Sequence, residues 1–169
     1  MTQSTIPRGL LHYMPNLLDY DYSIAMYEYM KDNIVWEDGV KSRVHGFTRK
    51  AKAVDPTSSS IPGLMEMITF AISSYIQQTR GVGTTTFAIY GTYINYYRNG
   101  CDFTPVHNHP GTIQLVISLG ASRTLNVGSK CVIMNSGDAV IFGVQKHDVP
   151  KDPNITEGRI SIATFIRFN

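Results

Sequence analysis

Cysteine is scarce in this sequence: Cys101 and Cys131 are the only two, and they stand apart without C-x-x-C spacing. We interpret them as reduced thiols of an intracellular protein, located in the cytoplasm or the nucleus. Long apolar runs are absent as well, since none approaches the roughly 18 residues that a membrane span needs. The N-terminal segment lacks the apolar core of a secretion signal, so we expect neither membrane association nor export.

Charge of one sign is also lacking. The net charge is +2 and the pI is about 8.5. This balance neither requires nor excludes a nucleic-acid partner, because a strong nucleic-acid footprint raises the pI above about 9. What the chain does contain is 43% hydrophobic and 17% charged residues over 169 positions. That composition is typical of a single globular domain, 1–169, with a real core, and we expect a monomer.

Two helices are expected in the first half of the chain. The first covers about 22–33, with Asp21 or Ser23 as its N-terminal cap. The second is capped by Ser60 and continues to about residue 80. Apolar residues recur along the second helix at helical spacing, which indicates one face buried against the core.

Short β-branched and aromatic runs dominate the second half, separated by Gly, Asn, Pro and Asp. The predicted strands are 85–90, 92–98, 104–107, 113–119, 123–127, 131–134, 139–142 and 159–168, with a short one at 34–36. This order predicts an α+β, mainly β fold: a double-stranded β-helix, or jelly roll, with two N-terminal helices packed on one sheet. We divide it into a helical and lid-like part, 1–83, and a jelly-roll core, 84–169.

A basic stretch precedes the second helix. Its members are Lys41, Arg43, His45, Arg49, Lys50 and Lys52. A charge run of this kind is typical of a solvated hairpin. The alternative is a lid that contacts the phosphates of a nucleic acid.

Three histidines are the candidate metal ligands. His107 and His109 are two residues apart beside a predicted strand, so their side chains point the same way. His147 follows a glycine-led strand that can return to meet the pair. Three imidazoles converging inside a β-fold favour a divalent transition metal. The alternative is a set of histidines that only form hydrogen bonds in a polar pocket.

The closing strand has two different faces. Arg159, Ser161, Ala163, Phe165 and Arg167 share one face. The residues between them form an apolar face that should pack on a sheet or a helix. The first face therefore places two arginines where the strand lines the mouth of the barrel.

These stretches together resemble the AlkB family of Fe(II)- and 2-oxoglutarate-dependent dioxygenases, from about residue 10 to the end. Asn95–Gly100 is similar to the family's N-x-Y-x-x-G, Ser118–Arg123 to its S-L-G-x-x-R, and Ser136–Gly143 to its G-D-v-v-v segment. Arg159–Ser161 resembles the start of its closing R-x-[SN]-x-T-x-R, and Thr48–Ala51 its nucleotide-recognition lid.

Two departures from the family pattern affect the site. The family's first metal motif is H-x-D, whereas this chain has His107-Asn108-His109. One possibility is that His109 replaces the carboxylate, which makes the net charge of the metal site more positive by one. The other is that the metal has only two protein ligands. In addition, the family's second closing arginine falls at Phe165, and Arg167 is the substitute available on the same strand face.

The resemblance implies Fe(II) and 2-oxoglutarate as cofactors, with the three histidines as catalytic metal ligands. Arg159, helped by Tyr97 and Ser161, would bind the far carboxylate of 2-oxoglutarate, because arginine offers a two-pronged donor. Asn95 or Arg167 would bind the near carboxylate.

The resemblance also implies oxidative demethylation or hydroxylation of nucleic-acid bases, with Arg49, Lys50 and Lys52 in the lid. Two alternatives stay open. One is a cupin-type metal enzyme without 2-oxoglutarate, in which Gln114 stands for the usual glutamate. The other is a catalytically lapsed binding domain, consistent with the missing aspartate and with Phe165.

Overall fold

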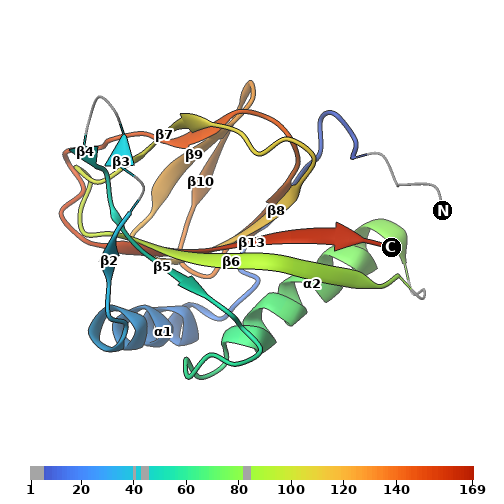
Figure 1. Ribbon diagram of the computed structural model, residues 1–169, viewed down its shortest axis with the longest axis horizontal. Coiled ribbons are helices and arrows are strands. Elements are labelled where there is room, and N and C mark those ends of the chain that lie inside the picture. The colour runs from blue at the N-terminus through green and yellow to red at the C-terminus, as the bar shows by residue number, and fades with distance from the viewer. Residues whose placement is uncertain (1–5, 40, 43–45, 82–84) are drawn as a thin grey trace.

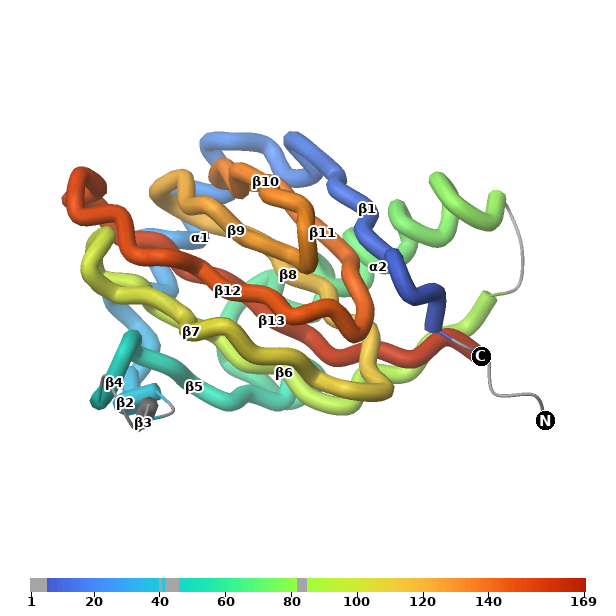
Figure 2. The backbone as a smooth tube through the Cα atoms, turned by 90° about the horizontal axis from the view of Figure 1, so that it is seen from above, coloured from blue at the N-terminus to red at the C-terminus, as the bar shows by residue number. Residues whose placement is uncertain are grey.

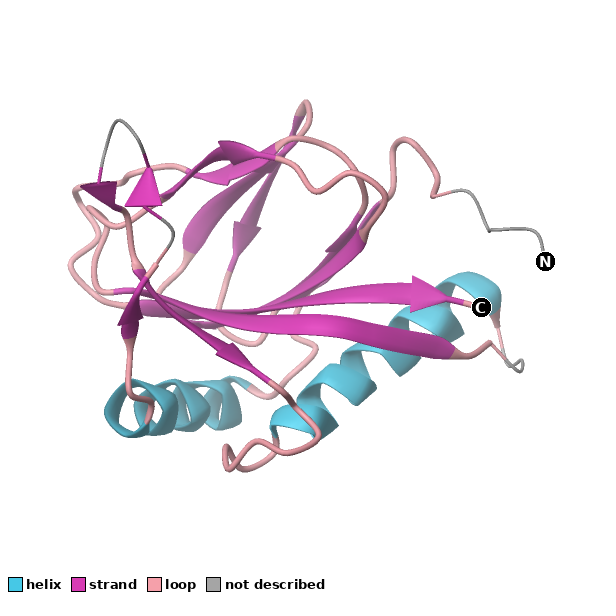
Figure 3. Ribbon diagram, in the orientation of Figure 1, coloured by secondary structure: helices cyan, strands magenta, loops and turns pink. Residues whose placement is uncertain are grey.

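A computed structural model describes residues 6–39, 41–42, 46–81 and 85–169. Arg43 and His45 of the basic stretch lie outside the described residues. Two helices, α1 (Tyr20–Asn33) and α2 (Leu64–Arg80), lie on one side of a seven-stranded sheet, and a four-stranded sheet lies on the other (Figures 1 and 3). Within the described part of the chain, neither helix is long and apolar enough to span a membrane.

The two sheets form the predicted jelly roll, with every paired strand antiparallel. The larger sheet has the order β1 (Leu11–Met14), β11 (Ala139–Phe142), β8 (Ile113–Gly120), β13 (Arg159–Phe168), β6 (Phe87–Tyr97), β5 (Lys50–Val54), β2 (Glu37–Asp38). The smaller has the order β10 (Lys130–Met134), β9 (Arg123–Val127), β12 (His147–Val149), β7 (Thr104–His107), side by side in Figure 2. β3 (Lys41–Ser42) and β4 (Gly46–Phe47) form a separate short pair.

Strand alternation divides the buried apolar residues into two cores. On β8, Leu115 and Ile117 face the helices, whereas Val116 faces the smaller sheet. On β13, Ile162 faces the helices and Ala163 the smaller sheet. Both faces of these central strands are therefore covered, and each fully buried aliphatic side chain stabilises the fold by about 1.5–3 kcal/mol.

The helix starts differ from the prediction. α1 begins at Tyr20, and its cap is Asp19, whose carboxylate accepts from the Tyr22 amide at 3.2 Å. The predicted cap Ser23 is instead buried and hydrogen-bonded to the Ser136 hydroxyl at 2.6 Å. The alternative cap, Asp21, lies in the first turn of the helix.

The second helix does not use Ser60 as a cap. It begins at Leu64, after Gly63, and has no side-chain cap. Gly63 has a φ of 72°, a left-handed conformation that glycine adopts without strain. The backbone conformation of Gly63 therefore sets the start of α2. The polar residues of the preceding loop gave no indication of this start.

Two strand predictions also change. The predicted strand at 34–36 is absent, and a two-residue strand, β2, lies instead at Glu37–Asp38, where β5 offers it an edge to pair with. The predicted strands 85–90 and 92–98 are one strand, β6, with a bulge opposite Phe165 and Ile166. Strands β1, β2 and β5 belong to the larger sheet, so the expected division at residue 83 does not separate layers.

Candidate metal centre and its cavity

A cavity of about 530 Å³ lies between the two sheets. β6 lines it with Tyr93, Asn95 and Tyr97, and β13 with every second residue from Arg159 to Phe165. Further walls come from the start of β5 and from β7, β8 and β12. The period of two along these strands explains why residues that are distant in sequence face the same space.

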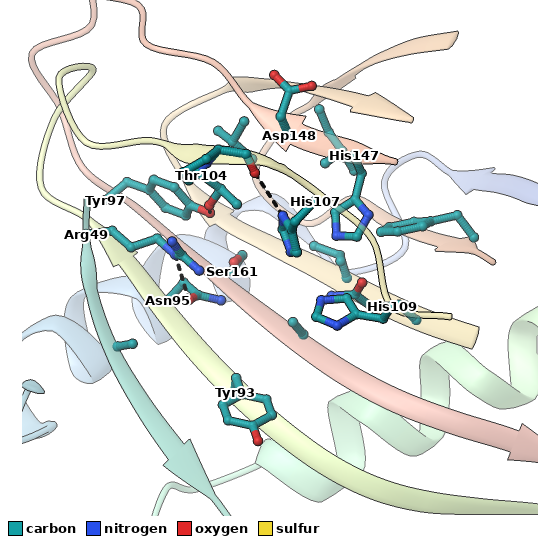
Figure 4. A pocket seen from close by; sticks show the side chains of 18 of the residues that line it. Arg49, Tyr93, Asn95, Tyr97, Thr104, His107, His109, His147, Asp148 and Ser161 are labelled. Carbon is teal, nitrogen blue, oxygen red and sulfur yellow. Dashed lines mark hydrogen bonds between the residues drawn. The ribbon is translucent and has the colours of Figure 1, made fainter. Parts of the chain in front are cut away.

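The three candidate ligands converge in this cavity (Figure 4). His107 ends β7, His109 follows in the next loop, and His147 begins β12. β12 pairs with β7 so that His147 lies opposite His107, with ring centroids 4.2 Å apart. The nitrogens that each ring offers lie within 4.8 Å of one another. Three imidazoles at this separation can coordinate one ion.

Hydrogen bonds fix two of these rings. The Nδ1 atom of His107 is 2.8 Å from the Pro105 carbonyl, and that of His147 is 3.2 Å from the Gln145 carbonyl. A carbonyl accepts from Nδ1–H, so the Nε2 lone pair stays available, as in metal sites. The Nε2 atom of His147 is buried and has no protein partner. The arrangement therefore fits a divalent transition metal.

Burial favours the neutral form of two of the three rings, His147 and His109. Burial lowers the pKa of His147 from its ordinary 6.5 to about 4. Burial also lowers the pKa of His109, and the charge of His107 adds to the effect. Neutral imidazole is the form that binds metal, so no proton has to leave these two rings at neutral pH.

The low pKa of His147 predicts how the stability of the metal-free protein depends on pH. Between pH 6.5 and about 4 the unfolded chain binds a proton at this ring and the folded chain does not. The free energy of unfolding should therefore fall as the pH falls through this window. Urea unfolding of the wild type and His147→Leu at several pH values isolates this contribution from those of the carboxylates. A stability difference that stays constant with pH would contradict the prediction.

Arg159 lies in the same cavity and is the largest fully buried side chain of the described residues. Its Nε donates to the Ser118 hydroxyl at 2.7 Å, its guanidinium lies over the Tyr97 ring, and its Nη1 has no partner. Burial lowers its pKa. No described acidic residue forms an ion pair with it. A buried cation of this kind needs an anion, and the described acidic residues do not supply one.

Tyr97 is held firmly beside Arg159. Its hydroxyl is 2.7 Å from the Thr104 hydroxyl, and the guanidinium of Arg123 lies over its ring. Arg123 itself is buried and donates to three backbone carbonyls, of Asn99, Asp102 and Pro150. The serine and the arginine of the S-L-G-x-x-R stretch therefore act as supports, Ser118 for Arg159 and Arg123 for Tyr97.

The glycine of the N-x-Y-x-x-G stretch has a steric role. Gly100 exchanges backbone hydrogen bonds with the loop before β13: it donates to Ile155 and accepts from Asp152. A Cβ atom at Gly100 would lie 1.6 Å from the Asp152 carbonyl oxygen, so no side chain fits. The contact fixes the turn after Tyr97 against the loop that leads to Arg159.

The other sequence-predicted residues separate into two groups. Asn95, Ser161 and Arg49 line the cavity, and Arg49 donates through Nε to the Asn95 Oδ1 at 2.9 Å. Lys50 and Lys52 do not line it, because they pair with Asp38 and Glu37 at 2.6 and 2.7 Å.

Arg167 does not reach the cavity. It is exposed, and its guanidinium lies over the Tyr90 ring. The strand continues past the end of the cavity, which Phe165 closes by packing against the His109 ring at 4.9 Å. The expectation that Arg167 binds the near carboxylate is therefore wrong on position.

The cavity also contains residues that the sequence did not mark for this role. Gln114, named above only as a cupin-like position, is buried and its Oε1 has no partner. It lies between Phe142 and Phe165 in the sheet, and their rings contact His147 and His109. Thr104 and Phe142 had no functional signal, because a threonine and a phenylalanine on strands are ordinary core residues.

Comparison of the sequence with protein-family profiles and with curated protein sequences finds no match. The fold is similar to many solved structures. A prolyl-4-hydroxylase from Pseudomonas putida has a TM-score of 0.62 at 15% identity, over 95% of this chain and 93% of that one. An oxidoreductase of the 2OG-Fe(II) oxygenase family from Burkholderia pseudomallei has 0.60 at 14%, over 93% and 85%. The protein OsALKBH1 has 0.63 at 16%, over 95% and 99%. These similarities confirm the jelly-roll fold.

Proposed function

We propose that this protein is an Fe(II)- and 2-oxoglutarate-dependent dioxygenase that demethylates or hydroxylates nucleic-acid bases. The observation that carries the proposal is the buried guanidinium of Arg159, without an ion-pair partner among the described residues, in the same cavity as three converging histidines. The cavity thus offers three metal ligands and a buried cation that no described acidic residue pairs with. 2-Oxoglutarate supplies a metal chelator and a distant carboxylate in one molecule.

The residues have distinct roles in this proposal. His107, His109 and His147 hold Fe(II), and His109 takes the place of the carboxylate in the usual set. Arg159 binds the far carboxylate through its Nη1, with Tyr97 and Ser161 beside it. When bound, iron and 2-oxoglutarate together supply oxidation of a substrate C–H bond by dioxygen, with release of succinate. The apolar walls, such as Val116, Leu125 and Phe142, exclude water from that chemistry.

One observation supports a nucleic-acid substrate: the sequence resembles the AlkB family along the motifs described above. Lys50 and Lys52 contribute less than expected, because acidic neighbours already neutralise them. Arg49, the third of these positions, lies in the cavity, where it is hydrogen-bonded to Asn95.

The test is incubation with Fe(II), 2-oxoglutarate and methylated or unmodified DNA and RNA oligonucleotides. We expect succinate together with loss of a methyl group or gain of an oxygen atom in the oligonucleotide, measured by mass spectrometry. His107→Ala should form neither product. Succinate without any change in nucleic acid would remove the nucleic-acid part, and absence of succinate under all conditions would contradict the oxygenase itself.

A cupin-type metal enzyme without 2-oxoglutarate is the second candidate, and Gln114 favours it. Its buried Oε1 has no partner and lies in the metal cavity, where a cupin would have a glutamate ligand. Thermal-shift titration with N-oxalylglycine, an inert analogue of 2-oxoglutarate, discriminates the two. A cupin should not respond. Metal analysis after reconstitution tests the third possibility, a lapsed binding domain, which would retain no metal.

A further inference from the structure

We infer that Arg49, held by Asn95, binds the near carboxylate of 2-oxoglutarate. This inference rests on the proposed function, because it concerns the co-substrate of the same cavity. Neither residue considered for the second closing arginine can bind this carboxylate. Phe165 has no charge, and Arg167 lies outside the cavity over Tyr90. Arg49 lies just before β5, which is two strands away from the closing strand β13 in the larger sheet.

Two hydrogen bonds fix the guanidinium of Arg49. Its Nε donates to the Asn95 Oδ1 at 2.9 Å, and its Nη1 donates to the Thr48 hydroxyl at 3.0 Å. Thr48 is buried and Asn95 nearly so, so both acceptors are rigid. The remaining N–H groups have no ion-pair partner among the described acidic residues. Figure 4 shows the side chain extending from the wall toward Ser161 and the histidines.

Asn95 completes a donor pair with Arg49. Because its Oδ1 faces Arg49, its Nδ2 group is the end that remains for a ligand. An amide N–H and a guanidinium N–H side by side form a cradle for one carboxylate. Asn95 thus orients Arg49 and also contributes a donor of its own.

The spacing of Asn95, which holds the Arg49 guanidinium, and Arg159 fits a dicarboxylic acid. Asn95 lies opposite Ser161, and Tyr97 lies opposite Arg159, so the two positions are two residues apart along the strands. Two residues of strand span about 7 Å. The carboxyl carbons of 2-oxoglutarate are four C–C bonds apart, a comparable length. Arg159 and the Arg49–Asn95 pair can therefore bind the two ends of one molecule.

The charge of the cavity supports the same conclusion. Its lining contains two arginines and a single carboxylate, Asp148, which points away from the histidines in Figure 4. A divalent metal ion adds two further positive charges, and a set of imidazole ligands, unlike one with a carboxylate, has no negative charge to offset them. A dianion that contacts both arginines is the complement of this distribution, so the binding of metal and of dianion should be mutually dependent.

Calorimetric titration of the Mn(II)-loaded protein with two ligands tests the inference. N-Oxalylglycine has both carboxylates, whereas pyruvate has only the near one beside its keto group. We expect Arg49→Gln to weaken both ligands at least about tenfold. Arg159→Met should weaken N-oxalylglycine alone. Lys50→Gln, which removes an ion-paired cation one residue away and outside the cavity, should change neither affinity.

A second variant and a second readout separate binding from folding. Asn95→Asp places a carboxylate on Arg49 and should reproduce the loss for both ligands. Arg49→Gln should bind Mn(II) alone at least as tightly as the wild type, because it removes a positive charge from the cavity. A misfolded variant would bind the metal more weakly.

The outcomes distinguish the inference from the function on which it rests. Equal affinity of Arg49→Gln and the wild type for both ligands would overturn the role of Arg49 and leave the oxygenase intact. A loss restricted to N-oxalylglycine would assign Arg49 to the far carboxylate and also overturn it. If the wild type binds no N-oxalylglycine with metal present, the proposed function fails as well.

Discussion

Replacing His147 with alanine is expected to weaken metal binding at least about 100-fold, since loss of a supporting hydrogen bond alone costs about 10- to 100-fold. His147 is one of three candidate ligands, and its Nε2 is buried without a protein partner. Its removal leaves two imidazoles and a hole that the rings of Phe142 and His107 border. Titration of the apoprotein with Co(II), followed by absorption, and elemental analysis of the purified protein measure the effect.

Two variants serve as controls for this experiment. His12→Ala removes a histidine that is hydrogen-bonded to Gln78 outside the cavity, and metal affinity should not change. His109→Asp converts the set into two histidines and a carboxylate, and it should bind Fe(II) more tightly than the wild type because a negative charge offsets the ion. Stoichiometric metal in His147→Ala would show that the three imidazoles are not a metal site.

Replacing Arg159 with methionine is expected to weaken N-oxalylglycine binding at least about 100-fold, in line with the 2–5 kcal/mol that loss of a buried charge partner costs. The same change should leave the stability of the ligand-free protein equal or higher. The guanidinium is fully buried, and no described acid pairs with it, so the folded protein bears the cost of its desolvation. Calorimetry gives the affinity, and urea unfolding gives the stability.

Arg167→Met is the matched control, because Arg167 lies on the same strand and face but is exposed over Tyr90. It should bind N-oxalylglycine like the wild type. A structural role for Arg159 would instead appear as a large loss of stability in Arg159→Met. If that variant bound the ligand normally, the far carboxylate would have to be bound elsewhere.

Local periodicity made much of the fold predictable. The bounds of β7, β9, β11 and β13 agree with the predicted strands, since each is a short apolar or alternating run closed by turn residues. The alternation along β13 also predicted that Arg159 and Ser161 share a face, and both line the cavity. The predictions were wrong where local sequence does not set the structure. The start of α2 has no side-chain cap to mark it, and the edge strand β2 is stabilised by its pairing with β5.

The sequence by itself determined the jelly roll and the inventory of its site: a histidine pair, a distant histidine and an arginine on the closing strand, because strand direction repeats every two residues. The tertiary structure decided which of these groups meet. His147 faces His107 through the pairing of β12 with β7. Arg167 does not line the cavity, because β13 continues beyond the end of the cavity at Phe165. Neighbouring residues along an extended chain face opposite sides. Arg49 therefore points into the cavity and contacts Asn95, whereas Lys50 points to the other side and pairs with Asp38.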